Sequence, residues 1–219
     1  MLDLNFTVEN VEAQPHAAAP LLIFKLRIAQ TVTAQEPATI PAIALRCQIR
    51  IEPTRRRYQP DEEEKLLDLF GTRERWGQTL RSTLWTHASV VVPPFTGETL
   101  IDLPVPCSFD FNVAATKYFH ALENGEVPLC LLFSGTIFYT DDDGYLQVSQ
   151  IPWEKEASFR LPVQVWKDMM ELYYPNSVWL CLERNTFDRL YRYKTGRGLP
   201  TWEQAIDTLI DSALEEVES

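Results

Sequence analysis

The sequence predicts one α+β domain: a mainly antiparallel β-sandwich or curved sheet with helices toward the C-terminus. At least four segments place apolar residues at every second position, which is the pattern of a strand with one buried face. These segments precede three segments whose apolar residues follow helical spacing. Runs of strands followed by runs of helices are typical of an α+β architecture.

The longest alternation covers residues 101–113 and marks the centre of the predicted core. A short helical pattern at 114–122 follows it, and a second strongly apolar run covers 127–139. Together they predict two long strands that flank a buried helical turn. The residues expected in the core are Cys47, Ile49, Phe109, Phe111, Leu131 and Phe133.

The first half of the chain is predicted to be β-rich with one helical insertion, about residues 60–86. We expect the insertion to begin with a helix at Asp61, because Glu64 lies three residues later as in a capping box. A second short helix is predicted at 78–85. The strands expected around the insertion are 4–8, 21–28, 43–51 and 88–92.

The second half continues with a hairpin and then becomes helical from about residue 162 to 219. Asp141-Asp142-Asp143-Gly144 is a turn signal between two strands. Thr201 and Gln204 form a capping box that starts the last helix. The remaining elements expected here are strands at 145–151, 157–161 and 178–182, a helix from Pro162 to before Pro175, and a helix at 187–193 capped by Asn185 or Thr186.

Composition limits the classes of function. The 219 residues carry a formal net charge of −11, which argues against general nucleic-acid binding, since that depends on Lys and Arg neutralising phosphates. No apolar run is long enough to span a bilayer. The first residues lack the basic start and apolar core of a signal peptide, so we expect a cytoplasmic protein.

The four cysteines indicate neither a metal site nor a disulfide framework. Cys47, Cys107, Cys130 and Cys181 are far apart, lie in apolar segments and form no C-x-x-C pair. Free Cys packs as a small hydrophobic residue, so buried, reduced and inert thiols are expected. The three histidines do not cluster with them, and no metal or other cofactor is predicted.

The predicted insertion carries the strongest basic cluster of the chain. Two interpretations stay open for it: surface arginines paired with the nearby acidic run, or a docking patch for an acidic partner or a phosphate. A competing patch consists of Arg189, Arg192 and Lys194 with Tyr191 and Tyr193. The residues predicted to bind a partner in the first patch are Arg55, Arg56, Arg57, Arg73, Arg75 and Trp76.

No catalytic motif stands out in the sequence. Ser134 lies in the middle of a predicted strand and has no G-x-S-x-G elbow around it. Glu154 and Glu156 flank a lysine and are candidates for acid–base work, although a surface salt bridge is the strongly favoured interpretation. An enzyme with an unrecognised, hydrolase-like site therefore stays an alternative that no catalytic residue supports.

Several short segments carry a resemblance to a known family. They are Gln48–Pro53, Leu103–Cys107, Lys117–Phe119, Leu132–Thr136, Ile151–Glu156, Leu190–Lys194 and Leu199–Trp202. They resemble an uncharacterised bacterial family of unknown function whose members tend to be encoded beside high-affinity uptake nickel–iron hydrogenases. The resemblance covers nearly the whole chain. It implies an association with hydrogenase genes but no mechanism, because no catalytic residues are established for that family.

The first functional hypothesis is a non-enzymatic accessory, assembly or adaptor protein that binds a protein partner. The resemblance implies a nickel–iron hydrogenase subunit or its maturation apparatus as that partner. Segregated charge and the absence of enzyme motifs favour the hypothesis. The alternatives are the enzyme described above and a metal or cluster carrier, which the scattered thiols disfavour.

Overall fold

The computed structural model describes residues 3–31, 37–107, 113–141, 144–177, 180 and 182–217. The chain divides into two compact units, residues 1–177 and 178–219, and each is described here by itself. The expectation of a single domain over residues 1–219 stays a prediction, because a division into compact units does not decide whether they fold independently.

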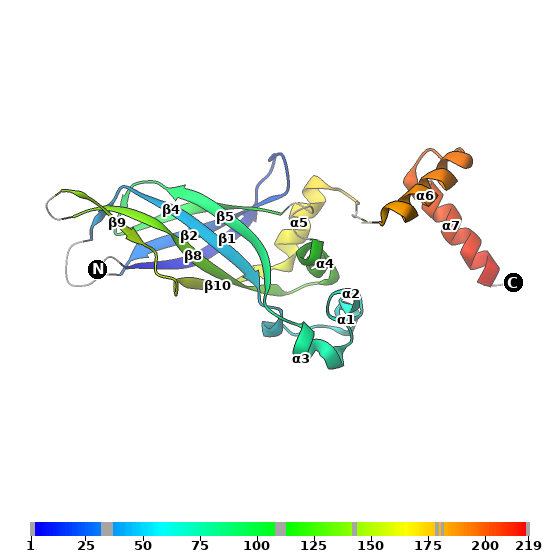
Figure 1. Ribbon diagram of the computed structural model, residues 1–219, viewed down its shortest axis with the longest axis horizontal. Coiled ribbons are helices and arrows are strands. Elements are labelled where there is room, and N and C mark those ends of the chain that lie inside the picture. The colour runs from blue at the N-terminus through cyan, green and yellow to red at the C-terminus, as the bar shows by residue number, and fades with distance from the viewer. Residues whose placement is uncertain are drawn as a thin grey trace. The chain divides into compact units, whose positions relative to one another are not determined.

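The first unit is built around two antiparallel sheets, as Figure 1 shows. One sheet has the order β1-β2-β7 and the other the order β10-β8-β4-β5, with β9 pairing to β8 beyond the end of β10. Every strand pair between described residues is antiparallel. The strands are β1 (Leu4–Ala13), β2 (Leu21–Gln30), β3 (Thr39–Ile40), β4 (Ala42–Ile51), β5 (Thr83–Val92), β6 (Phe95–Thr96), β7 (Glu98–Pro106), β8 (Glu126–Thr140), β9 (Leu146–Gln150) and β10 (Glu156–Pro162).

The core lies between the two sheets, where the alternating apolar residues meet. All five odd-numbered residues of β4 from 43 to 51 are buried. Phe6 of β1 stacks on Phe133 of β8 with ring centroids 4.3 Å apart, and Phe24 of β2 packs edge-on against Trp85 of β5. These contacts join opposite sheets, so the predicted α+β fold with an antiparallel sandwich is confirmed.

The predicted core residues that the structure describes are buried as expected. They are Cys47, Ile49, Leu131 and Phe133. Phe109 and Phe111 lie outside the described residues. In β7, Ile101, Leu103 and Val105 face the core, which confirms the alternation from 101.

The helices of this unit gather at one end of the two sheets (Figure 1). Between β4 and β5 the chain forms the insertion, residues 53–79, with α1 (Pro60–Lys65), α2 (Leu67–Phe70), α3 (Trp76–Thr79) and two 3₁₀ turns at Pro53–Arg55 and Arg73–Arg75. Helix α4 (Val113–Ala121) precedes β8, and α5 (Val163–Tyr173) follows β10. Trp166 of α5 stacks on Phe119 of α4 with centroids 4.9 Å apart, which fixes the two helices to each other.

The second unit contains α6 (Arg184–Gly196) and α7 (Trp202–Val217). The backbone N–H of Gln204 donates to Thr201 Oγ1 at 3.2 Å, so the predicted start of the last helix is confirmed. The cap of α6 is Glu183, two or three residues before the predicted Asn185 or Thr186. No helix among the described residues is long and apolar enough to cross a membrane.

Some predicted elements are wrong in detail. The helix expected at 78–85 overlaps strand β5, because Trp85 packs into the core and Thr83–Val92 pairs with β4. Such long-range pairing overrides local helix propensity. The capping box of α1 joins Gln59 to Glu62 rather than Asp61 to Glu64. Leu180 and Leu182 are not in a strand, and the rest of 178–182 lies outside the described residues.

Candidate functional site

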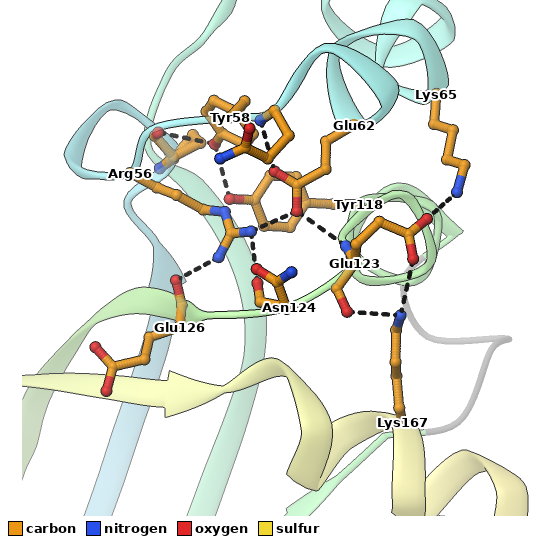
Figure 2. Close-up of polar contacts among 11 residues, drawn as sticks. Arg56, Tyr58, Glu62, Lys65, Tyr118, Glu123, Asn124, Glu126 and Lys167 are labelled. Atoms are coloured by element: carbon orange, nitrogen blue, oxygen red, sulfur yellow. Dashed lines mark hydrogen bonds and ion pairs between the residues drawn. The ribbon is translucent and has the colours of Figure 1, made fainter.

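The predicted arginine cluster does not form one exposed patch, because Arg56 is inside the fold (Figure 2). Its side chain is only 8% exposed. The guanidinium donates to Glu62 Oε1 at 2.6 Å and to the backbone carbonyls of Asn124 and Glu126 at 2.7 and 2.9 Å. Arg56 therefore ties the insertion to the connection between α4 and β8.

Glu62 is the buried partner of Arg56 and also organises backbone around it. Its side chain is 1% exposed, and Oε1 accepts a second hydrogen bond, from the Glu123 backbone N–H at 2.9 Å. Oε2 accepts from the Gln59 backbone N–H at 3.0 Å, which closes the capping box of α1. Three donors to this carboxylate, one of them the guanidinium of Arg56, offset much of the cost of its burial.

Two phenols complete this junction, Tyr118 buried and Tyr58 half-buried. Tyr58 Oη lies 2.8 Å from both the Pro53 carbonyl, to which it donates, and the Tyr118 hydroxyl. The guanidinium of Arg56 stands 5.7 Å from the centre of the Tyr58 ring. Burial raises the pKa of Tyr58 to about 12 and also raises the pKa of Tyr118. Both phenols are neutral at physiological pH, so the junction acts as structure rather than as an acid–base pair.

The other arginines of the predicted patch are exposed, and Trp76 is not. Arg55, Arg57, Arg73 and Arg75 are all exposed, and Arg73 also pairs with Glu63 at 2.6 Å. Trp76 is half-buried, donates from its indole N–H to the Gly71 carbonyl and packs edge-on against Tyr58. The pairing of Arg73 with the acidic run agrees with the first of the two interpretations of this cluster.

The competing patch on α6 is partly exposed. Arg189 and Arg192 face solvent, while Lys194 lies 5.5 Å from the centre of the Trp202 ring. Tyr191 also contacts Trp202, with ring centroids 6.0 Å apart. Tyr191 and Lys194 therefore join α6 to α7 through Trp202, whereas Arg189 and Arg192 are exposed.

A different surface gathers exposed apolar side chains on one edge of the larger sheet. We call it the β9–Trp153 edge and define it by Tyr145, Leu146, Val148 and Trp153. All four are strongly exposed, and Trp153 is 90% exposed. Among the described residues β9 pairs with β8 alone, so its second edge has no strand partner. Large aromatic and apolar side chains at an open strand edge are typical of a protein-binding surface.

The sequence analysis did not single out this surface. The strand at 145–151 is predicted, and Trp153 lies in one of the segments that carry the family resemblance. Alternation in β9 is weak, however, and all but one of its five residues are exposed. The only signal in the sequence is a tryptophan between Pro152 and two glutamates, in a segment too polar to be core.

The candidate catalytic residues do not form a site in the described part of the chain. Ser134 lies exposed on β8 opposite Arg46 and makes no hydrogen bond to a His, Asp or Glu among the described residues. Glu154 is exposed in the turn after β9. Glu156 lies near the Cys130 thiol, with Sγ and Oε2 3.7 Å apart. A nucleophile with a positioned base is therefore not seen in these ranges.

No group of three or more His, Cys, Asp or Glu side chains among the described residues is placed to hold a metal ion. In the 141–144 turn, Asp141 Oδ1 accepts a hydrogen bond from the Tyr145 backbone N–H and Oδ2 accepts from the Gln147 side chain. Asp142 and Asp143 lie outside the described residues. The contacts of Asp141 are those of a residue that stabilises the β8–β9 turn.

We expect the thiols to differ in reactivity. Burial raises the pKa of Cys47 and of Cys107 to about 12, so neither supplies thiolate at pH 8. Cys130 is half-buried, and burial and Glu156 raise its pKa less. In a Cys181→Ser background, native-state labelling at pH 8 should modify Cys130 first and the other two only after denaturation. Rapid native labelling of Cys47 or Cys107, located by peptide mass spectrometry, would contradict this assignment.

Comparison with known proteins places the chain in a family but gives no activity. A search of curated proteins found no match. Among solved structures, the chain is similar to the CARDB domain of a Pyrococcus furiosus protein in complex with di-metal ions, at 10% identity and a TM-score of 0.27, covering 74% of this chain and 92% of that one. It is also similar to the putative ApaA protein from Bordetella pertussis, at 15% identity and a TM-score of 0.25, covering 73% and 93%. A family model described as "Family of unknown function (DUF6084)" matches residues 1–218, and the chain therefore belongs to that family.

Proposed function

We propose that this chain is a non-enzymatic accessory protein of the cytoplasm that binds a protein partner through the β9–Trp153 edge. The observation that carries the proposal is the exposure of Trp153 beside a strand with an open edge. Tryptophan is among the residue types that most often dominate interface energies. An exposed tryptophan that contributes nothing to the core suits a role in recognition.

The open edge of β9 suits an extended segment of the partner. An unpaired strand edge presents backbone N–H and C=O groups that a further strand can bind. Leu146 and Val148 are exposed on this strand and lie two residues apart, so they share one face of the sheet. The partner segment should therefore carry apolar side chains at alternate positions, next to Leu146 and Val148.

The turn that carries Trp153 is held in place by backbone hydrogen bonds. The Ile151 N–H donates to the Gly135 carbonyl at 2.9 Å, and the Phe133 N–H donates to the Lys155 carbonyl at 2.9 Å. Lys155 also pairs with Asp3 at 2.5 Å, which joins the turn to the start of β1. A fixed turn loses less conformational entropy on binding than a free loop, and this supports tight recognition by Trp153.

The family resemblance supports a component of an uptake nickel–iron hydrogenase system as the partner. Its subunits and its maturation proteins are the first candidates to test. The membership in a family of unknown function adds no activity, so the resemblance remains the ground for this choice.

The proposal predicts that Trp153→Ala and Val148→Lys each reduce capture of the hydrogenase-system partner from the native host. Truncation of an interface tryptophan costs about 2 kcal/mol or more, which is roughly thirtyfold in affinity. Quantitative mass spectrometry of affinity-purified complexes measures the loss. Leu172→Ala is the matched control, since Leu172 is an exposed apolar residue on α5 and should leave capture unchanged. Equal capture by wild type and both edge variants would contradict the proposed surface.

A further inference from the structure

The backbone groups on the free edge of β9 belong to three of its residues. The Ile151 N–H donates to the Gly135 carbonyl at 2.9 Å, and the Asp141 N–H donates to the Tyr145 carbonyl at 3.0 Å. In an antiparallel pair, residues bonded in this way alternate with residues whose N–H and C=O point away from the partner strand. The residues of β9 with outward backbone groups are therefore Leu146, Val148 and Gln150.

The side chains of these residues lie on the outer face of the larger sheet. Val148 stands opposite the half-buried Phe138, whereas Ser149 stands opposite the buried Ile137 on the inner face. Leu146 and Val148 are 64% and 58% exposed, so the outer side of this edge is apolar. A strand added to β9 covers both side chains when its own apolar residues lie on the outer face.

The pairing along β8 is interrupted directly after β9. It ends with Ile151 opposite Gly135 and resumes with Lys155 opposite Phe133. Three residues, 152–154, therefore face the single β8 residue between these pairs and form a bulge in the strand edge. A strand that pairs with β9 cannot continue past this bulge along β10, so one of its ends lies beside residues 152–154.

Trp153 and Glu154 are the exposed central residues of the bulge. The Lys155 N–H donates to the Pro152 carbonyl at 3.1 Å and closes a tight turn around them. The Lys155 side chain pairs with Asp3 at 2.5 Å and is only 17% exposed. Among the ion pairs between described residues, none includes Glu154. The exposed part of the bulge is thus an indole ring next to a carboxylate.

An indole ring and a carboxylate side by side have the chemistry to recognise a cation. The ammonium of a lysine or the guanidinium of an arginine is attracted to the face of an indole ring and also pairs with a carboxylate. Glu156 is exposed two residues further along and adds a second negative charge at this end of β9. The charge at this end of the edge therefore complements a basic residue of a partner.

We propose that the partner segment that pairs with β9 carries a lysine or an arginine at the end that lies beside Trp153 and Glu154. This inference rests on the proposed function and specifies the chemistry of the segment. Its backbone bonds to the outward groups of Leu146, Val148 and Gln150, and its apolar side chains lie on the outer face of the sheet. Main-chain bonds and apolar contacts supply affinity, and the cation fixes the register of the segment against the bulge.

The charge is tested by capture of the hydrogenase-system partner on the full chain at low ionic strength, measured by quantitative mass spectrometry. Glu154→Lys should lower the apparent affinity about tenfold, because it places a like charge beside the basic residue of the partner. Added salt should reduce the difference between this variant and wild type. Glu64→Lys makes the same charge change at an exposed position of α1 and should leave capture unchanged. Equal capture by Glu154→Lys and Glu64→Lys would overturn the inference.

Val148→Pro tests the backbone of β9. The proline removes an N–H that points away from β8, so the urea midpoint should stay near that of wild type. Capture should still fall about tenfold below that of Val148→Ala, which shortens the same side chain and keeps the N–H. Ser149→Pro is the converse variant: the Ser149 N–H faces Ile137 of β8, so its loss should lower the urea midpoint. Equal capture by Val148→Pro and Val148→Ala would show that the partner does not bond to this backbone.

Cross-linking identifies the segment that lies on the edge. A photoreactive amino acid in place of Gln150, followed by peptide mass spectrometry, should link to a partner segment with apolar residues at alternate positions and a lysine or arginine at one end. A linked segment without a basic residue contradicts the inference. Linkage to residues 146–150 of a second copy of this chain contradicts it too, since the edge would then bind itself.

Failure of this inference is distinguishable from failure of the proposed function. If Trp153→Ala and Val148→Lys leave capture unchanged, the β9–Trp153 edge is not the binding surface and both ideas are wrong. If these two variants lower capture while Glu154→Lys and Val148→Pro behave as their controls do, the edge binds the partner, but not as a strand with a basic end.

Discussion

Replacing Glu62 with alanine is expected to lower the free energy of unfolding of the first unit by about 3–5 kcal/mol. The substitution removes the one carboxylate that pairs with Arg56 among the described residues, and it leaves a side chain that is 8% exposed without that counter-charge. It also leaves the backbone N–H groups of Gln59 and Glu123 without their acceptor. Removing one partner of a buried ion pair costs more than the net contribution of the pair, because the remaining charge stays desolvated.

Urea unfolding, followed by tryptophan fluorescence and circular dichroism, measures this loss. Glu64→Ala is the matched control: Glu64 lies on the same helix but is exposed, and its loss should change stability by about 0.5 kcal/mol or less. The double variant Arg56→Met with Glu62→Leu removes both charges and should be more stable than Glu62→Ala. A Glu62→Ala chain as stable as the Glu64→Ala control would show that the junction contributes nothing.

The burial of Arg56 could not be predicted from the sequence. It stands between two other arginines, and nothing in residues 55–57 distinguishes the buried one from its exposed neighbours. Its acceptors come from Glu62, six residues away, and from Asn124 and Glu126, almost 70 residues away. Reversal of Arg56 to Glu is therefore expected to disrupt the junction, a result that the assignment of Arg56 to a partner-binding patch does not anticipate.

The strands were predictable because one of their faces is buried. The alternation of β4 gives the correct inward residues, and the long runs of β7 and β8 give the centre of the core. Trp85 is different, since its segment has no clear period and is a strand only because it pairs with β4. A shift of one residue in the pairing register turns every side chain of a strand to the opposite face. The local sequence pattern of this segment does not specify the register.

Exposure was the hardest property to predict. The apolar face of α7 is evident from its spacing, but an amphipathic helix looks the same whether a core or a second molecule covers it. The exposure of Trp153 is difficult to predict for a different reason: tryptophan is largely buried in most folds, so the residue type alone favours a place in the core. Only the pairing of β8 with β10 before Gly135 and with β9 after it shows that the intervening turn projects from the sheet.

Gly135 is the residue that permits this change of partner, and Gly135→Ala is expected to cost about 3 kcal/mol or more. Its φ is +140°, and a Cβ built there would lie 2.0 Å from the carbonyl oxygen of Ala44 in β4. That oxygen belongs to the backbone of a central strand and has little room to move. The Gly135 carbonyl also accepts the hydrogen bond from Ile151 that starts the Trp153 turn.

We therefore expect Gly135→Ala to lower both the urea midpoint of the first unit and partner capture through the displaced turn. The neighbouring exposed residue gives the control: Ser134→Ala should change stability by about 0.5 kcal/mol or less and leave capture intact, since the Ser134 side chain is exposed and its hydroxyl makes no hydrogen bond among the described residues. If the Gly135→Ala variant unfolds at the wild-type urea midpoint, β4 and β8 move apart at this position without loss of stability. The close approach of Gly135 to the Ala44 carbonyl then does not hold the turn. If the midpoint falls while capture by the remaining folded protein is unchanged, the backbone at Gly135 supports the sheet but does not position Trp153.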